Sequence, residues 1–212
     1  PGAPGRTEVA LALAWRWAAA RRTLLLDLDL DAPALAVRLG RPPRPDLVDV
    51  AEAVHESGAL PPRAVAECGP LGLVVGSTRR EDGSLPPHLV ADVATAARSL
   101  AELVVLDAGA RRGDDPLLKA ADGVILVAEA SPAGLARAAR VAADWAGPRP
   151  QLVLNRVHRP QAAEVVAAAR RWTGLEPRAL VPERAVITAA ARAARPPAPP
   201  LRRALRRLEP GA

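Results

Sequence analysis

The sequence is poor in several residue types that most proteins of its length contain. Its 212 residues include no Phe, Tyr or Met, one Cys and one Lys. Cys68 has no second cysteine to pair with, which excludes an internal disulfide and makes the cytoplasm the expected compartment. The absence of Met leads us to expect that further residues precede Pro1. With four Trp as the only aromatic side chains, the core must be built from Leu, Val and Ala.

Long apolar runs are absent as well. No stretch of about 18 uncharged apolar residues occurs, which excludes a membrane-spanning helix. Half of the residues are nevertheless hydrophobic and a quarter are charged, a balance that excludes disorder of the whole chain. The length and composition predict one globular domain over residues 1–195, followed by a Pro-rich connection and a basic C-terminal helix over residues 196–212.

The chain carries a net charge of +6, and most of this charge lies near its C-terminal end. From Arg192 onward there are six Arg and one acid, Glu209. Because the remainder is nearly neutral, the sequence argues against a general nucleic-acid-binding surface. Leu201, Leu205 and Leu208 alternate with arginines at helical spacing in this tail. The spacing has two interpretations: a helix that contacts an anionic membrane surface, or a final helix that packs back on the domain.

Alternating hydrophobic patterns predict the fold class. Short, continuously apolar runs are typical of strands covered on both faces, whereas longer Ala-, Leu- and Arg-rich stretches have the period of helices. Their alternation predicts an α/β fold, a doubly wound, mostly parallel sheet with helices on both faces. The expected strands are Thr23–Leu28, Gly72–Val75, Leu103–Leu106, Gly123–Val127, Gln151–Leu154 and Arg178–Val181. The expected helices are Thr7–Ala20, Pro87–Ala101, Gly134–Ala146, Gln161–Trp172 and Leu201–Leu208.

The chain opens with PGAPGRTE, a Gly- and Pro-rich loop that leads into an apolar helix. Such a loop can bind phosphate, because unpaired backbone N–H groups and the helix dipole point at the anion. In the usual motif, G-x-x-x-x-G-K-[ST], the last three positions would be taken by Gly5, Arg6 and Thr7. Taken alone, this is a weak signal, because most Gly- and Pro-rich loops are ordinary turns.

Polar residues end several of the expected strands. TLLLDLD contains Asp27 and Asp29, which lie two residues apart and so point to one side of the chain. LVVLDAG reaches Asp107, in the form that holds Mg²⁺ through water. QLVLNR reaches Asn155, a residue suited to hydrogen-bonding the edge of an adenine. Each of these side chains has an alternative role, in capping a helix or satisfying loop backbone.

In this order along the chain, the motifs resemble those of the MinD/ParA family of deviant Walker A P-loop ATPases, including its TadZ/CpaE-like and septum-site-determining branches. The resemblance covers essentially the whole chain. It implies a sheet of seven or eight strands, whose central first strand would precede Pro1. Five patterns of the family align with this chain. KGGVGKTT aligns with Pro1–Glu8, VDLD with Leu26–Asp29, and the Walker B strand with Leu103–Gly109. The pattern hhhN aligns with Leu152–Asn155, and IPxD-xxV-xxA aligns with Val181–Ala189.

The resemblance implies that the chain binds ATP or ADP together with Mg²⁺. Gly2, Gly5, Arg6 and Thr7 would wrap the β-phosphate, and the hydroxyl of Thr7 would also ligate the metal. Asp107 would hold the water shell of the Mg²⁺ ion.

The remaining roles that the resemblance implies concern water and the base. Asp29 or Asp27 would position the attacking water, and Asn155 with the loop at Pro182 would receive adenine. The family also implies a homodimer and protein partners in a positioning or secretion system. By analogy with MinD, the basic C-terminal helix would contact the inner membrane weakly from the cytoplasm.

Three departures from the family pattern concern charge at the phosphate loop. Arg6 replaces the P-loop lysine, and its planar guanidinium is larger than the ammonium group. The signature lysine aligns with Pro1, and Lys119 lies too far along the chain to serve either role. Glu8 replaces a second Thr, and its carboxylate repels phosphate. At roughly 5 Å and an effective dielectric near 20, two unit charges repel each other by about 3 kcal/mol.

These features lead to three hypotheses about function. The first is a MinD/ParA-like protein with a degenerate phosphate loop that acts in spatial positioning of a septum, a pilus or secretion assembly, or a chromosome or other cargo, through nucleotide-influenced dimerisation. The second is a Mg²⁺-dependent ATPase, fast or slow, in which Arg6 serves in place of lysine. The third is a pseudo-ATPase interaction module that binds no nucleotide.

Overall fold

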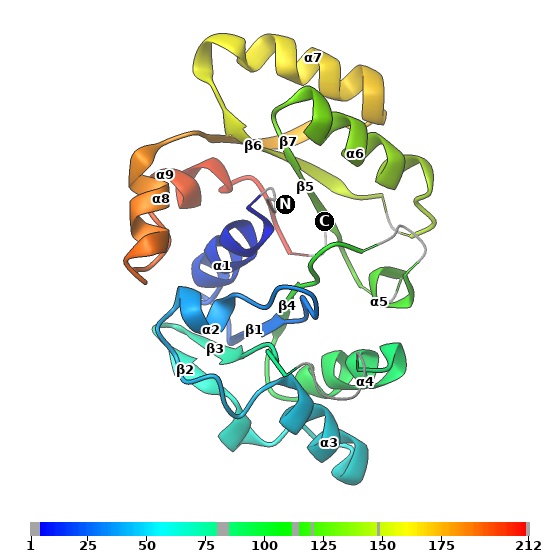
Figure 1. The fold of residues 1–212 in the computed structure, drawn as a ribbon, viewed down its shortest axis with the longest axis vertical. Coiled ribbons are helices and arrows are strands. Elements are labelled where there is room, and N and C mark those ends of the chain that lie inside the picture. The colour runs from blue at the N-terminus through cyan, green and yellow to red at the C-terminus, as the bar shows by residue number, and fades with distance from the viewer. Residues whose placement is uncertain (1–4, 80–84, 112–114, 120, 148, 211–212) are drawn as a thin grey trace. The chain divides into compact units, whose positions relative to one another are not determined.

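The computed structural model describes residues 5–79, 85–111, 115–119, 121–147 and 149–210. The chain divides into two compact units, each built on its own sheet (Figure 1). The four-stranded unit comprises Ala10–Ala110 and Ala191–Pro196. The three-stranded unit comprises Pro1–Val9, Arg111–Ala190 and Pro197–Ala212.

The sheet of the four-stranded unit has the strand order β2-β3-β1-β4. Its central strand β1 runs parallel to β3 and β4, whereas β2 pairs antiparallel with β3. All five residues of β1 are buried, as expected for a continuously apolar strand covered on both faces. The strands are β1 (Thr23–Asp27), β2 (Ala66–Cys68), β3 (Leu71–Val74) and β4 (Leu103–Asp107).

Helices flank this sheet, and Leu11 and Ala14 of α1 pack with Leu25 of β1 and Leu73 of β3 in its core. The helix α3 begins at a capping box, in which the side chains of Asp46 and Asp49 each accept a hydrogen bond from the other residue's backbone N–H. The helical elements are α1 (Arg6–Trp17), whose first residues belong to the three-stranded unit, α2 (Leu35–Arg38), α3 (Leu47–Ser57), the 3₁₀ turn η1 (Pro62–Ala64) and α4 (Pro87–Ala97).

The sheet of the three-stranded unit is entirely parallel, with the order β5-β6-β7. The helices α6 and α7 lie side by side and pack against β5 and β7 respectively (Figure 1). The strands are β5 (Ile125–Glu129), β6 (Gln151–Val157) and β7 (Pro177–Pro182). The helical elements are α5 (Pro116–Lys119), α6 (Pro132–Ala143), the 3₁₀ turn η2 (Arg159–Gln161), α7 (Ala162–Thr173), α8 (Ala185–Arg192), which ends in the four-stranded unit, and α9 (Pro199–Ala204).

The C-terminal segment belongs to the core of the three-stranded unit. The helix α9 packs against β7, and Leu201, Leu205 and Leu208 are all buried. Of the four arginines between them, those at positions 203, 206 and 207 are exposed. Of the two interpretations that the sequence leaves open, the packing supports the helix that folds back on the domain.

The predicted fold class is confirmed: parallel strands alternate with helices that flank them. The single sheet of seven or eight strands implied by the resemblance differs from the structure, in which seven strands among the described residues form two sheets. Within these sheets β4 and β5 are edge strands. A strand upstream of Pro1 stays a prediction. None of the helices in the described part of the chain combines the length and the apolarity needed to cross a lipid bilayer.

Candidate functional site

The described part of the predicted phosphate loop begins at Gly5, since Gly2 lies outside the described residues. The backbone N–H of Val9 donates to the carbonyl of Gly5 at 3.1 Å, so that the first turn of α1 starts on this glycine. Gly5 has a φ of +82°, a conformation that only glycine adopts without strain. Arg6 and Thr7 follow in the first turn and are partly exposed.

Asn155 lies directly against Gly5. A Cβ atom built on Gly5 would lie 2.3 Å from Nδ2 of Asn155, which shows that the amide group packs on the Cα of the glycine. Asn155 pairs with Glu129 at the carboxyl end of the β5–β6 ladder, and its carbonyl accepts a hydrogen bond of 2.8 Å from the N–H of Ala130. The three-stranded unit thus brings two predicted site residues together, from positions about 150 residues apart in the sequence.

The residue after Asn155 has an unusual backbone. Arg156 has a φ of +58°, and the β6–β7 register shifts between Leu154 and Val157. Its guanidinium lies 3.6 Å from the carboxylate of Glu129. Left-handed backbone at a non-glycine residue is strained and often marks a functional site. No local pattern predicted this bulge.

Pro182 ends β7 beside β6, where it pairs with Val157. The carboxylate of the next residue, Glu183, lies 2.6 Å from Nε2 of His158. An open hollow of about 290 Å³ is lined by His158, Pro160 and Gln161. The pairing of His158 with Glu183 was not predicted, because the two residues belong to different strand–helix connections.

Asp27 is a buried carboxylate at the end of β1. Its side chain accepts hydrogen bonds from the backbone N–H groups of Ala34 and Leu35, both at 2.9 Å, and of Asp29 at 3.3 Å. It therefore holds the start of α2, which agrees with the alternative role in capping a helix. Burial raises the pKa of Asp27 to about 6. The hydrogen bond from Leu35 opposes this rise, and the negative charge of Asp107 adds to it.

Asp107 occupies the position on β4 that pairs with Asp27. It is also buried, and its carbonyl accepts a hydrogen bond of 2.9 Å from the N–H of Leu28. Asp29 lies partly exposed beyond the end of β1. Its carboxylate contacts Gly109, where an added Cβ would lie 2.5 Å from Cγ of Asp29. The four-stranded unit thus gathers all three predicted carboxylates at one edge of its sheet.

The predicted roles of these residues stay predictions, but their environments differ in a useful way. The oxygens of Asp27 are committed to three backbone N–H groups. Asp29 accepts a hydrogen bond from the N–H of Ala32 at 3.1 Å and remains partly open to solvent. Of the two carboxylates proposed to position water, Asp29 is therefore the more accessible. No group of three or more His, Cys, Asp or Glu side chains within the described ranges has the arrangement of a metal site.

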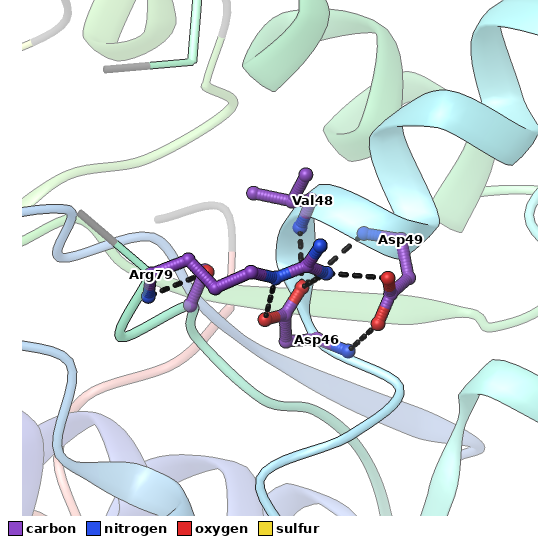
Figure 2. Close-up of polar contacts among 5 residues, drawn as sticks. Asp46, Val48, Asp49 and Arg79 are labelled. Carbon is purple, nitrogen blue, oxygen red and sulfur yellow. Dashed lines mark hydrogen bonds and ion pairs between the residues drawn. The ribbon is translucent and has the colours of Figure 1, made fainter. Parts of the chain in front are cut away.

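A second charged cluster lies elsewhere in the four-stranded unit and was missed in the sequence. Figure 2 shows Arg79 reaching from the segment after β3 to the capping box of α3. Its guanidinium donates to Asp46, with Nε at 2.9 Å and Nη2 at 2.6 Å, and also to Asp49. The only sequence signal was the pair of acids three residues apart before an apolar periodic run. The cluster ties α3 to the sheet.

Comparison with known proteins gives results at the level of structure only. No family model matches the sequence, and no curated protein matches it either. Among solved structures, a ParA family ATPase from Chlorobium tepidum TLS is similar over 97% of this chain and 93% of its own, with a TM-score of 0.83 and 18% identity.

Two MinD structures are similar as well. The MinD cell division protein of Aquifex aeolicus, solved in a MinC:MinD complex, has a TM-score of 0.73 and 17% identity, covering 92% of this chain and 83% of its own. The septum site-determining protein MinD of Pyrococcus horikoshii OT3, solved with Mg-ADP, has a TM-score of 0.70 and 19% identity, with the same coverage. The fold of this chain is therefore that of the MinD/ParA family of P-loop ATPases.

Proposed function

We propose that this chain is a nucleotide-binding protein of the MinD/ParA type with an altered phosphate loop. The observation that carries the proposal is the gathering of Asp27, Asp29 and Asp107 at the carboxyl ends of the neighbouring parallel strands β1 and β4. In open α/β sheets, ligands bind outside the carboxyl ends of the strands.

The side chains present suit a nucleotide with Mg²⁺. The ion, when bound, would neutralise charge on the phosphates. Thr7 would supply a hydroxyl ligand and Asp107 would orient the water shell of the metal. The unit that contains Gly5 and Asn155 has 17 basic and 10 acidic residues, a net charge of +7, whereas the four-stranded unit has 12 basic and 13 acidic residues. An excess of positive charge favours binding of a polyphosphate.

The altered phosphate loop is expected to slow hydrolysis more than binding. Arg6 keeps a positive charge but presents a planar fork in place of a compact ammonium group. Glu8 places a carboxylate in the first turn of α1, where it repels phosphate. We therefore propose weakened binding and slow turnover, with nucleotide acting mainly as a conformational signal.

The proposed role is spatial positioning of a septum, a pilus or secretion assembly, or a chromosome or other cargo. A nucleotide-influenced homodimer would present surfaces to protein partners. The similarity to a ParA family ATPase and to MinD from a MinC:MinD complex supports this role. A membrane contact through the C-terminal segment would depend on its exposed arginines, because Leu201, Leu205 and Leu208 are buried within the unit.

Isothermal titration calorimetry of the full chain with ATP and Mg²⁺ tests the proposal. We expect micromolar or weaker binding of ATP by the parent protein and at least a tenfold loss of affinity in Asp107→Asn. The matched control is Asp92→Asn, at an exposed acid on α4. A variant that fails to fold is recognised by its melting temperature.

Two other results would favour the alternatives. Brisk phosphate release, abolished in Asp29→Ala without loss of binding, would overturn the altered-loop proposal and support an ATPase that uses Arg6. No heat of binding, together with an unchanged melting temperature in excess ATP, would support a module that binds no nucleotide, since a ligand specific for the native state must raise stability.

A further inference from the structure

The contact between Gly5 and Asn155 suggests a role for Asn155 that differs from reading the base. A Cβ on Gly5 would lie 2.3 Å from Nδ2 and 3.5 Å from Cγ of Asn155. The amide group therefore occupies the space that any other residue at position 5 would need for its side chain. Because α1 begins on Gly5, this contact is made at the start of the helix.

Asn155 is held firmly by the sheet. Its backbone pairs with Glu129 across the β5–β6 ladder, and its carbonyl accepts a hydrogen bond from Ala130. The bulge at Arg156 and the contact between Arg156 and Glu129 follow directly after it, near the carboxyl end of β6. The side chain of Asn155 is thus mounted on a rigid element, while Gly5 belongs to a turn with unusual backbone freedom.

We propose that Asn155 is a positioning residue: its amide group packs against Gly5 and fixes where α1 begins, and with it the direction of the first N–H groups of the helix. The inference rests on the proposed function, because those N–H groups matter only if they bind phosphate. Anions at a helix N-terminus are bound by N–H groups of the first turn, so a small shift of this turn weakens every phosphate ligand alike.

Binding measurements separate positioning from base recognition. The affinities of ATP, GTP and inorganic tripolyphosphate, each with Mg²⁺, are measured for the parent, for Asn155→Ala and for the control Thr188→Ala, at an exposed residue of α8. We expect Asn155→Ala to lose about tenfold in affinity for all three ligands, and the control to lose none. A loss confined to ATP, with tripolyphosphate binding unchanged, would overturn the positioning role.

A stability cycle tests the contact itself without any ligand. The variants are Gly5→Ala, Asn155→Ala and the double variant. Gly174→Ala is the control, because Gly174 also has a positive φ, of +67°, but an added Cβ there would have no atom within 4 Å. We expect Gly5→Ala to lower the melting temperature more than Gly174→Ala, and Asn155→Ala to restore part of that loss in the double variant. Additive effects, with Gly5→Ala no worse than the control, would contradict the proposal.

The two experiments also distinguish this inference from the proposed function. If the parent binds none of the three ligands, both the nucleotide function and the positioning role fail. If the parent binds them and Asn155→Ala binds them equally well, the positioning role alone fails and the proposed function stands.

Discussion

Asp27 of β1 and Asp107 of β4 occupy paired positions at the ends of two neighbouring parallel strands, and both are buried. Two carboxylates so placed oppose each other's ionisation. Burial and the neighbouring charge together raise the pKa of Asp27 to about 6, against the hydrogen bonds from Leu35, Ala34 and Asp29. At the end of β1 the fold thus keeps a carboxyl group that changes charge close to neutral pH.

This raised pKa predicts a pH dependence of stability. The folded state binds a proton on Asp27 more tightly than the unfolded chain, so the contribution of this group to stability is greatest below about pH 4 and is lost as the pH rises through 6. The loss is about 3 kcal/mol at most. Urea unfolding between pH 4 and 7 should show this decline in the parent and in Asp31→Asn, at an exposed acid nearby, but a flatter profile in Asp27→Asn. Equal slopes in all three proteins would contradict the assignment.

Arg79 should stabilise the four-stranded unit through Asp46. Burial opposes ionisation of Asp46, but hydrogen bonds from Arg79 and from the N–H of Asp49 outweigh it and hold its pKa below the usual value. Replacing Arg79 by Met leaves a buried carboxylate without its partner and is expected to cost about 2–3 kcal/mol of unfolding free energy. Chemical denaturation at pH 7 measures this loss.

The matched variant for this test is Arg63→Met, at an exposed arginine of the same unit, which should change stability by less than about 0.5 kcal/mol. Because Asp46 is stabilised as the anion, its contribution is present above its unfolded pKa and is lost as the pH falls. An Arg79→Met protein as stable as the parent would show that the cluster in Figure 2 is not maintained in solution.

The burial of the C-terminal leucines predicts which residues of this segment matter for folding. Leu205 is fully buried, so Leu205→Ala should lower the unfolding free energy by about 2–5 kcal/mol. The control Arg206→Ala, at an exposed neighbour, should be nearly neutral. If Leu205→Ala left stability unchanged and instead abolished binding to anionic vesicles, the leucines would face a membrane and the packing against β7 would be wrong.

Glu8 offers a direct test of the altered phosphate loop. Removing its charge in Glu8→Thr should tighten ATP binding by ten- to a hundredfold, because repulsion of up to about 3 kcal/mol between the carboxylate and phosphate is relieved. The variant Glu8→Asp keeps the charge and should bind like the parent. Titration calorimetry at constant pH and salt compares the three proteins, and equal affinities would show that Glu8 does not face the phosphates.

The sequence predicted most of the fold because its regular elements follow local rules. The continuous apolar runs correspond to six of the seven strands within one to three residues at their ends, and β2 was missed because three residues carry no readable period. The helix α3 was missed although Leu47, Val50, Ala51 and Val54 have helical spacing and Asp46 caps them. Short helices such as α2 depend on a distant carboxylate, Asp27, and have no local signal of their own.

The candidate site was predictable in its residue types but not in its contacts. Motif order indicated Asp27, Asp29, Asp107 and Asn155, because strand ends are readable from the apolar pattern. The packing of Asn155 on Gly5 joins residues far apart in sequence, and the bulge at Arg156 depends on pairing between strands. Tertiary contacts of this kind leave no trace in hydrophobic periodicity.

The three-stranded unit is assembled from three separate stretches of the chain, and its core includes Leu205 and Leu208. During synthesis, which proceeds from the N-terminus, nearly all of the four-stranded unit leaves the ribosome first. The β5–β7 sheet cannot bury its last side chains until residue 208 has emerged from the exit tunnel. This half of the molecule is therefore completed last, and a nascent chain stalled before residue 205 would still expose the apolar surface that recruits chaperones.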